Sequence, residues 1–143
     1  MSSTKICVDA NIVVRLVAPD PDRDVFNLWR AWRKEGTELV APSLIRFEVT
    51  NTFHRMRLAG NVDDDLADTL LSLALDLPIT LFGDAWLHQD ALALAGKFRL
   101  EAAYDAHYVA LARHLGAELW TLDKRLYNTV HPYLDFVRLV DDA

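Results

Sequence analysis

The sequence predicts an α/β fold, in which helices cover both faces of a mainly parallel central sheet of four to five strands. Short apolar runs alternate with longer segments of helical patterning, and the runs lie too far apart in the chain to pair as hairpins. Strands connected through helices pair in parallel, and a parallel sheet is buried on both faces. With 143 residues, no internal repeat and no Gly-, Ser- or Pro-rich linker, the chain is predicted to form one domain over residues 1–143.

The first half of the chain is predicted to run strand, helix, strand, helix, helix. The first helix has acids at its start and bases at its end, before Gly36, which is the polarity that the helix dipole favours. The second helix opens at Pro42 and Ser43 and stops before Gly60, and the third begins with acids. In chain order these elements are Lys5–Val8, Asp22–Glu35, Glu38–Ala41, Ser43–Ala59 and Asp63–Leu75.

The second half is predicted to run strand, helix, helix, strand, strand. Its first strand follows Pro78, and the second of its helices stops before Gly116. The last strand follows the turn at Pro132 and is placed at an edge of the sheet. In chain order these elements are Ile79–Phe82, Asp84–Phe98, Ala102–Leu115, Glu118–Thr121 and Phe136–Val140.

Composition excludes several classes of protein. The longest stretch without Asp, Glu, Lys or Arg is nine residues, Leu126–Leu134, whereas a membrane span needs about 18 apolar residues. Asp9 and Asn11 interrupt the first apolar run, which is untypical of a secretory signal, so we expect a cytoplasmic protein. The only cysteine, Cys7, rules out an intramolecular disulfide and a multi-cysteine zinc site. The net charge of −6 argues against a protein that coats phosphates, but not against a nuclease with metal-binding carboxylates.

Glycine and histidine spacing excludes several common catalytic motifs. The five glycines are never closer than 96 − 83 = 13 positions, so neither GxxxxGK nor GxGxxG occurs. The sequence lacks a G-x-S-x-G turn, and its five histidines show neither HExxH spacing nor a cysteine partner. We interpret each histidine as a surface or structural residue and Cys7 as a core residue.

Two aspartates fall at the carboxyl ends of predicted strands, Asp9 after KICV and Asp123 after ELWT. Functional sites in open parallel sheets gather at the carboxyl ends of the strands, so these two side chains are candidates for one site. The alternative for each is a turn former or a helix cap.

Two further acids lie on predicted helices. Glu48 falls on the apolar side of its helix, where a buried carboxylate needs a cation, a metal ion or water; an arginine elsewhere is the alternative. Asp105 falls in the first turn of its helix, which capping alone would explain, but small neighbours leave it space to face a site. Four acids from two strand ends and two helices would form an oxygen-rich pocket that suits Mg²⁺ or Mn²⁺. Without a metal, the four carboxylates would repel one another.

Three segments resemble a known family: VDANIVVRL around Asp9, PSLIRFEVTN around Glu48, and YDAHYVALARHLGAELWTLDKRL across Asp105 and Asp123. The chain resembles PIN-domain ribonucleases, specifically the VapC-type toxins of toxin–antitoxin pairs, over essentially its whole length. The third segment is the most specific, because an acid, a helix, a glycine stop, a strand and T-x-D occur there in the family's order. The resemblance implies a PIN-like three-layer α/β/α domain.

The resemblance also implies roles for individual residues. Asn11 and Thr121 match small polar residues that orient a carboxylate or a water, although turn roles stay open for both. Arg15 and Arg125 are our candidates for contacts to the RNA backbone. The four acids are expected to hold Mg²⁺, with Mn²⁺ as a substitute, directly or through water: Asp9, Glu48, Asp105 and Asp123.

The implied activity is metal-assisted hydrolysis of RNA that leaves a 5′-phosphate and a 3′-hydroxyl, because water rather than the ribose hydroxyl is the nucleophile. A VapC-type toxin would inhibit translation by cleaving tRNA or ribosomal RNA. Its partner would be a VapB-like antitoxin, and the toxin itself a homodimer. Trp29 and Trp32, three residues apart, are interpreted as packing residues, with a groove for a partner helix as the alternative.

Three other functions stay open at this point. The fold could serve as a non-catalytic RNA- or protein-binding module, since a fold does not guarantee an activity. A PIN domain could also be a housekeeping RNA-processing nuclease. A Mg²⁺-dependent hydrolase of small phosphate esters is a further alternative, although Asp9 is followed by Ala10 and Asn11 rather than by the D-x-D of dehalogenase-like sites.

Overall fold

The computed structural model describes residues 4–20 and 22–140, and its centre is a parallel sheet. The strands stand in the order β3-β2-β1-β4-β5, and each neighbouring pair is parallel. The α/β class predicted from the alternating pattern is therefore confirmed. The strands are β1 (Lys5–Val8), β2 (Glu38–Pro42), β3 (Ile79–Phe82), β4 (Glu118–Thr121) and β5 (Val137–Leu139).

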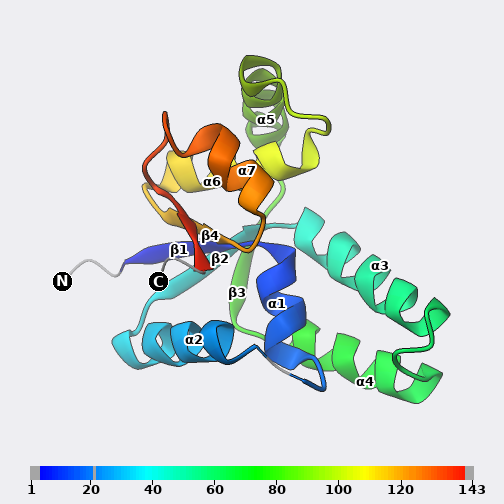
Figure 1. Ribbon diagram of the computed structural model, residues 1–143. Coiled ribbons are helices and arrows are strands. Elements are labelled where there is room, and N and C mark those ends of the chain that lie inside the picture. The colour runs from blue at the N-terminus through cyan, green and yellow to red at the C-terminus, as the bar shows by residue number, and fades with distance from the viewer. Residues whose placement is uncertain (1–3, 21, 141–143) are drawn as a thin grey trace.

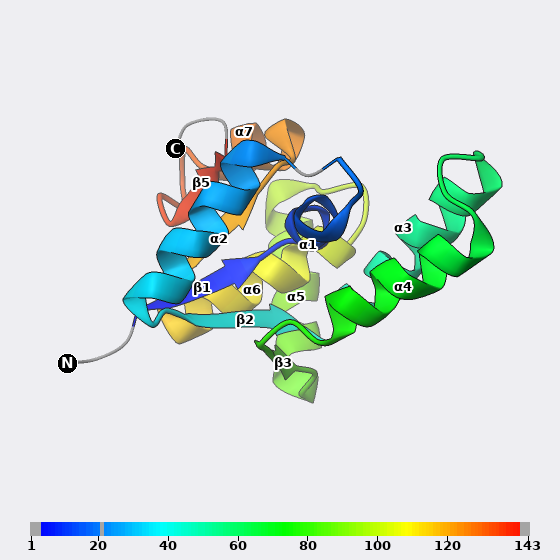
Figure 2. The same cartoon turned by 90° about the horizontal axis from the view of Figure 1, so that it is seen from below.

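Helices cover both faces of the sheet. Figure 1 shows α5 and α6 on one side of the strands and α1 and α2 on the other. Two helices, α3 and α4, lie side by side and extend together away from the sheet (Figure 2). The helices are α1 (Ala10–Val17), α2 (Arg23–Glu35), α3 (Leu44–Leu58), α4 (Asp64–Leu75), α5 (Ala85–Phe98), α6 (Tyr104–Leu115) and α7 (Lys124–Val130).

Two of these helices, α1 and α7, are not predicted by the sequence. Each follows a strand end after a single aspartate or a short turn, and each is brief, with eight and seven residues. The β-branched residues of α1 favour strand as much as helix, and a helix of two turns carries too little periodicity to be recognised. The predicted stops at Gly36 and Gly116 are confirmed, since both adopt the left-handed conformation that glycine accepts freely, with φ of 72° and 64°.

The sheet order places the carboxyl ends of β1 and β4 side by side. From β1 the chain crosses to β2 on one side, and β4 later returns to pair with β1 on the other side, so the strand order reverses at this point, where ligands bind in open α/β sheets. The backbone N–H of Asp9 donates to the carbonyl of Trp120 at 3.3 Å, so this pairing extends to the first residue beyond β1. The aspartates that follow these two strands are therefore brought to the same edge.

Predicted core residues lie where the sequence pattern places them. Cys7 is fully buried in β1, and Trp32 is buried with its ring 5.9 Å from that of Trp120. Trp29 is partly buried against the same core. Over residues 4–20 and 22–140, none of the helices combines the length and the apolar character needed to cross a membrane.

Candidate functional site

Thr121 links the two strand-end aspartates. This residue ends β4 and has no exposed surface. Its hydroxyl donates to Oδ2 of Asp9 at 2.6 Å, and the Thr121 hydroxyl oxygen accepts a hydrogen bond from the backbone N–H of Asp123 at 3.0 Å. The one hydroxyl therefore sets the positions of two acids that come from distant parts of the chain.

Each of these aspartates also caps the helix that follows it. Oδ1 of Asp9 accepts the backbone N–H of Asn11 at 2.9 Å at the start of α1. Oδ1 of Asp123 accepts the N–H groups of Arg125 and Leu126 at 2.9 and 3.1 Å at the start of α7. The capping role considered from the sequence is thus present, and it leaves Oδ2 of Asp123 without a backbone cap contact in the part of the chain that is described.

Glu48 projects from α3 and meets a tyrosine. The Tyr108 hydroxyl donates to Oε1 of Glu48 at 2.6 Å, and the Tyr108 side chain is only 3% exposed. The sequence suggests a metal, water or an arginine as the partner of this acid, so the tyrosine is a residue that sequence reasoning misses. Tyr108 lies three residues after Asp105, and the one signal in the sequence is a hydroxyl on a helix face that already carries an acid.

The charges of the acids act on one another. Burial raises the pKa of Asp9, and the charge of Asp123 adds to the rise, while hydrogen bonds from Thr121 and Asn11 oppose it. Burial likewise raises the pKa of Glu48; the Tyr108 hydrogen bond opposes this rise. Burial, and then the negative charges of the other three acids, raise the pKa of Asp105 from 3.8 to about 6. The four acids therefore share one electrostatic environment.

The donor set has the chemistry of a hard-metal site, but it is not a closed cage. Carboxylate and hydroxyl oxygens are the ligands that Mg²⁺ prefers, and Mg²⁺ commonly keeps several waters while one or two carboxylates hold it. Within residues 4–20 and 22–140, no group of three or more His, Cys, Asp or Glu side chains could hold a metal ion together. The arrangement fits an ion bound partly through water and does not fit a dry multi-ligand cage.

The structure gives the remaining predicted residues different surroundings. Asn11 contacts Asp9 through its backbone N–H, a group that any residue other than proline would supply, and the residue is exposed. Arg15 pairs with Asp22 at 3.1 Å, which ties the end of α1 to the start of α2. Arg125 pairs with Glu101 at 3.6 Å, and both of these side chains are more than four-fifths exposed.

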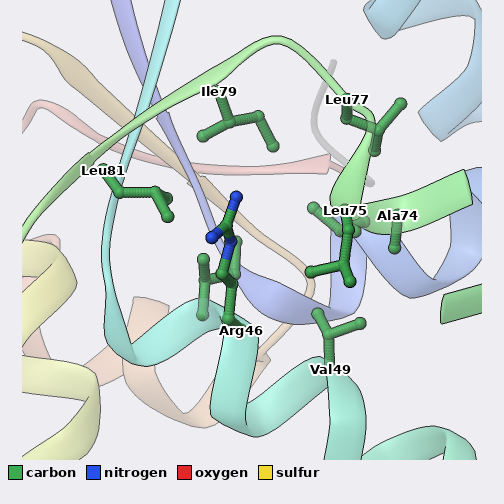
Figure 3. A pocket seen from close by; sticks show the side chains of 9 residues that line it. Arg46, Val49, Ala74, Leu75, Leu77, Ile79 and Leu81 are labelled. Atoms are coloured by element: carbon green, nitrogen blue, oxygen red, sulfur yellow. The ribbon is translucent and has the colours of Figure 1, made fainter. Parts of the chain in front are cut away.

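Two of the hollows in the described residues lie on different parts of the molecule. One, of about 380 Å³, is lined by Asp105, Asp123 and Arg125 together with the loop between α5 and α6. The other, of about 30 Å³, lies between α1, α3, α4 and β3, and Figure 3 shows Arg46 reaching among its apolar side chains. None of the four acids lines the second hollow, so only the first adjoins the candidate site.

The histidines occupy surface or structural positions, as interpreted from the sequence. His107, half-buried on α6, bonds the Ala103 carbonyl at 2.7 Å and His88 at 2.9 Å. A positive charge on His107 lowers the pKa of Glu48, so this histidine is close enough to act on the site electrostatically. Sequence spacing alone offers no reason to single it out.

Comparisons with known proteins identify the family and the fold of this chain. Residues 6–131 match the PIN domain family. The chain is 31% identical over 126 residues to Ribonuclease VapC3 of Pyrobaculum aerophilum, covering 85% of this chain and 92% of the relative. Among solved structures, PAE2754 of Pyrobaculum aerophilum has a TM-score of 0.73 at 23% identity, covering 99% of this chain and 94% of the other. A toxin–antitoxin complex from Klebsiella pneumoniae has a TM-score of 0.66 at 16% identity, covering 97% and 98%.

Proposed function

This chain belongs to the PIN-domain family, and from that membership we propose that it is a VapC-type endoribonuclease that hydrolyses RNA phosphodiester bonds. One observation carries the proposal: Asp9 and Asp123, at neighbouring strand ends, are joined through the buried Thr121 hydroxyl, within the electrostatic influence of Asp105 and Glu48. A purely structural role would not require acids packed so closely that burial, and then the negative charges of neighbouring acids, raise the pKa of Asp9, Glu48 and Asp105. The name of the relative, a ribonuclease, supplies the substrate class.

A divalent metal, Mg²⁺ with Mn²⁺ as a substitute, is part of this proposal. Asp9 and Asp123 are the carboxylates best placed to hold it, and Asp105 and Glu48 would act directly or through water. A bound Mg²⁺ would polarise the scissile phosphate and lower the pKa of a bound water.

The protein's own groups orient the acids and contact the RNA backbone. Thr121 and the Asn11 N–H hold the Asp9 carboxylate in one orientation, and the cap hydrogen bonds do the same for Asp123. Tyr108 positions Glu48 by a charge-assisted hydrogen bond. Arg15 and Arg125 remain our candidates for RNA backbone contacts, of which Arg125 lines the hollow beside the acids.

The test is incubation of the purified protein with total cellular RNA, including tRNA and ribosomal RNA, followed by mapping of new 5′ ends. We expect discrete 5′-phosphate ends that require Mg²⁺ or Mn²⁺ and disappear with a chelator, because water is the nucleophile. A 2′,3′-cyclic phosphate would show that the ribose hydroxyl attacks instead. If folded protein produces no new ends with either metal, the non-catalytic alternative replaces this proposal.

Metal binding is expected to offset the loss of stability that occurs when Asp105 ionises. Folding raises the pKa of Asp105 from 3.8 to about 6, so the folded state favours the protonated side chain. The stability that Asp105 contributes is therefore fully present below pH 3.8 and is lost as the pH rises through about 6. Urea unfolding of metal-free protein should therefore show declining stability over that range, and Mg²⁺ should stabilise more at pH about 7.5 than at about 5. Asp105→Asn should flatten this decline, and an unchanged profile in that variant would contradict the assignment.

The proposal includes an antitoxin partner, as in the Klebsiella pneumoniae complex that shares the fold. The apolar hollow of Figure 3 could accept one apolar side chain, and Arg46 offers a charge to a neighbouring acid of such a partner. A VapB-like protein of this chemistry should bind the wild type and suppress RNA cleavage. Arg46→Glu should weaken the complex by at least about tenfold in calorimetry, and equal affinity would exclude this surface.

We further propose a homodimer. Phe47 and Leu58 on α3 are about three-quarters exposed, and Phe47 lines a hollow with Leu81 beside the edge strand β3. Large apolar side chains exposed in this way are typical of interaction surfaces. Light scattering should give twice the monomer mass for the wild type and a mass closer to that of the monomer for Phe47→Ser. A monomeric wild type at high concentration would refute the dimer.

A further inference from the structure

The hollow beside Asp105 and Asp123 has the size and the chemistry of a ligand site. Its volume, about 380 Å³, falls within the range of roughly 300–1,000 Å³ in which proteins hold small ligands. The two acids form one part of its wall, and the end of α5, the loop between α5 and α6, and α7 form the rest. A molecule held there would lie directly against two of the carboxylates proposed to hold the metal.

The lining divides into basic and apolar parts. Arg99 and Arg125 supply two guanidinium groups, which suit a phosphate, and Leu100 and Leu126 supply apolar surface. Arg125 pairs with Glu101 at 3.6 Å, but both side chains are exposed, so this pair is weak and can be exchanged for a phosphate. Two cations and an apolar wall next to acids are the combination that a nucleotide beside a metal would require.

The backbone at Arg99 gives a second, independent indication. Arg99 ends α5 in the left-handed conformation, with φ of 52° and ψ of 45°, and it is the one residue other than glycine with positive φ in the described ranges. Gly36 and Gly116 end α2 and α6 in the same conformation, for which glycine is best suited. An arginine that tolerates this strain at the rim of a hollow indicates a use for its side chain.

We propose that this hollow is a subsite for one unpaired nucleotide of the RNA, adjoining the phosphate that is cut. Arg99 and Arg125 bind the phosphate of that nucleotide, and Leu100 and Leu126 contact its base. Single-stranded positions are favoured, because only a base outside a duplex can turn into such a hollow. This inference rests on the proposed ribonuclease function and specifies how that site takes its substrate.

The test compares Arg99→Gly and Arg125→Ala with Arg113→Ala, which removes the same charge from the exposed far end of α6. Binding is measured by fluorescence anisotropy with labelled single-stranded RNA, in an Asp9→Asn background that is expected to cut the probe about a thousandfold more slowly. We expect each of the two hollow variants to bind about tenfold more weakly. The affinity should also depend less steeply on salt: the negative slope of log affinity against log salt should become smaller in magnitude by about 0.7 for each phosphate that the variant no longer neutralises. Arg113→Ala should leave both quantities unchanged.

Arg99→Gly separates a binding role from a purely structural one. Glycine relieves the left-handed strain, so this variant should be at least as stable as the wild type in urea while its RNA binding is weaker. In the cleaving protein, KM for RNA should rise and kcat at saturating RNA should stay unchanged. Nucleoside 5′-monophosphates should inhibit cleavage competitively, and more weakly in both hollow variants.

The outcomes distinguish the subsite from the activity. If the wild type cuts RNA and the hollow variants match Arg113→Ala in binding, salt slope and KM, the subsite is wrong and the nuclease stands. If the wild type does not cut RNA but binds it through Arg99 and Arg125, the subsite stands and the nuclease fails. If the protein neither cuts nor binds RNA, both are wrong.

Discussion

Replacing Asp9 with asparagine is expected to lower the rate of RNA cleavage by about a thousandfold without unfolding the protein. The carboxylate charge would hold the metal, and loss of one group that stabilises a charged transition state costs roughly 10²–10³ in rate. Asparagine has the same shape and can still accept the Asn11 N–H at the start of α1. Because burial and Asp123 disfavour the ionised Asp9, a neutral side chain should leave the metal-free protein as stable or more stable.

Initial rates at saturating Mg²⁺ and urea unfolding of the same preparation measure the two effects of Asp9→Asn. Asp63→Asn is the matched control, since Asp63 also caps a helix, α4, by accepting the Leu66 N–H at 2.8 Å, but does not belong to the four acids. Asparagine caps helices as well as aspartate does, so this control should keep both activity and stability. If Asp9→Asn retains more than about a tenth of the wild-type rate, Asp9 is not a metal ligand.

Thr121→Val is expected to cause the second-largest loss. Valine has the shape of threonine but lacks the hydroxyl, which donates to Asp9 and accepts from the Asp123 N–H in a fully buried position. The variant leaves a buried N–H and a carboxylate oxygen without this partner, at a cost of about 1–3 kcal/mol in the free energy of unfolding. Loss of a group that orients metal ligands typically lowers activity or metal affinity by about 10–100-fold.

The Mg²⁺ concentration that gives half-maximal cleavage is the decisive measurement for Thr121→Val, since a loss of stability alone would not raise it. Thr121→Ser keeps the hydroxyl and removes one buried methyl, so it should lose about 1 kcal/mol of stability and retain near-normal Mg²⁺ dependence. Were valine and serine to behave alike in the Mg²⁺ titration, the hydroxyl would have no part in holding the acids.

Much of the architecture is predictable because its signals are local. Acids at the start of α2, bases at its end and a left-handed glycine after it are properties of neighbouring residues, so the sequence predicts its ends within a residue. The short strands are recognisable for the same reason, since each consists mainly of apolar residues that are neighbours in the chain. Where the local signal is short or ambiguous, as in α1 and α7, the sequence does not predict the helices.

Side-chain contacts between distant parts of the chain are not predictable in the same way. Tyr108 and Glu48 are 60 residues apart, and no spacing rule joins a hydroxyl on one helix to a carboxylate on another. Arg15 is a candidate for RNA contacts by its position after Asp9, yet in the folded chain it pairs with Asp22. The strained backbone at Arg99 likewise has no sequence signature, because arginine is ordinary near the C-terminal end of a helix.

The sequence by itself determined the order of the five strands and the five longer helices and placed Asp9 and Asp123 at strand ends, because residue spacing along the chain decides both. The tertiary structure alone decided that β1 and β4 are neighbours, that Thr121 reaches Asp9 across 112 positions, and that Asp105 and Arg125 line one hollow. The physical reason is that hydrogen bonds and charges act over a few ångströms in space, whereas sequence patterns report only on neighbours in the chain.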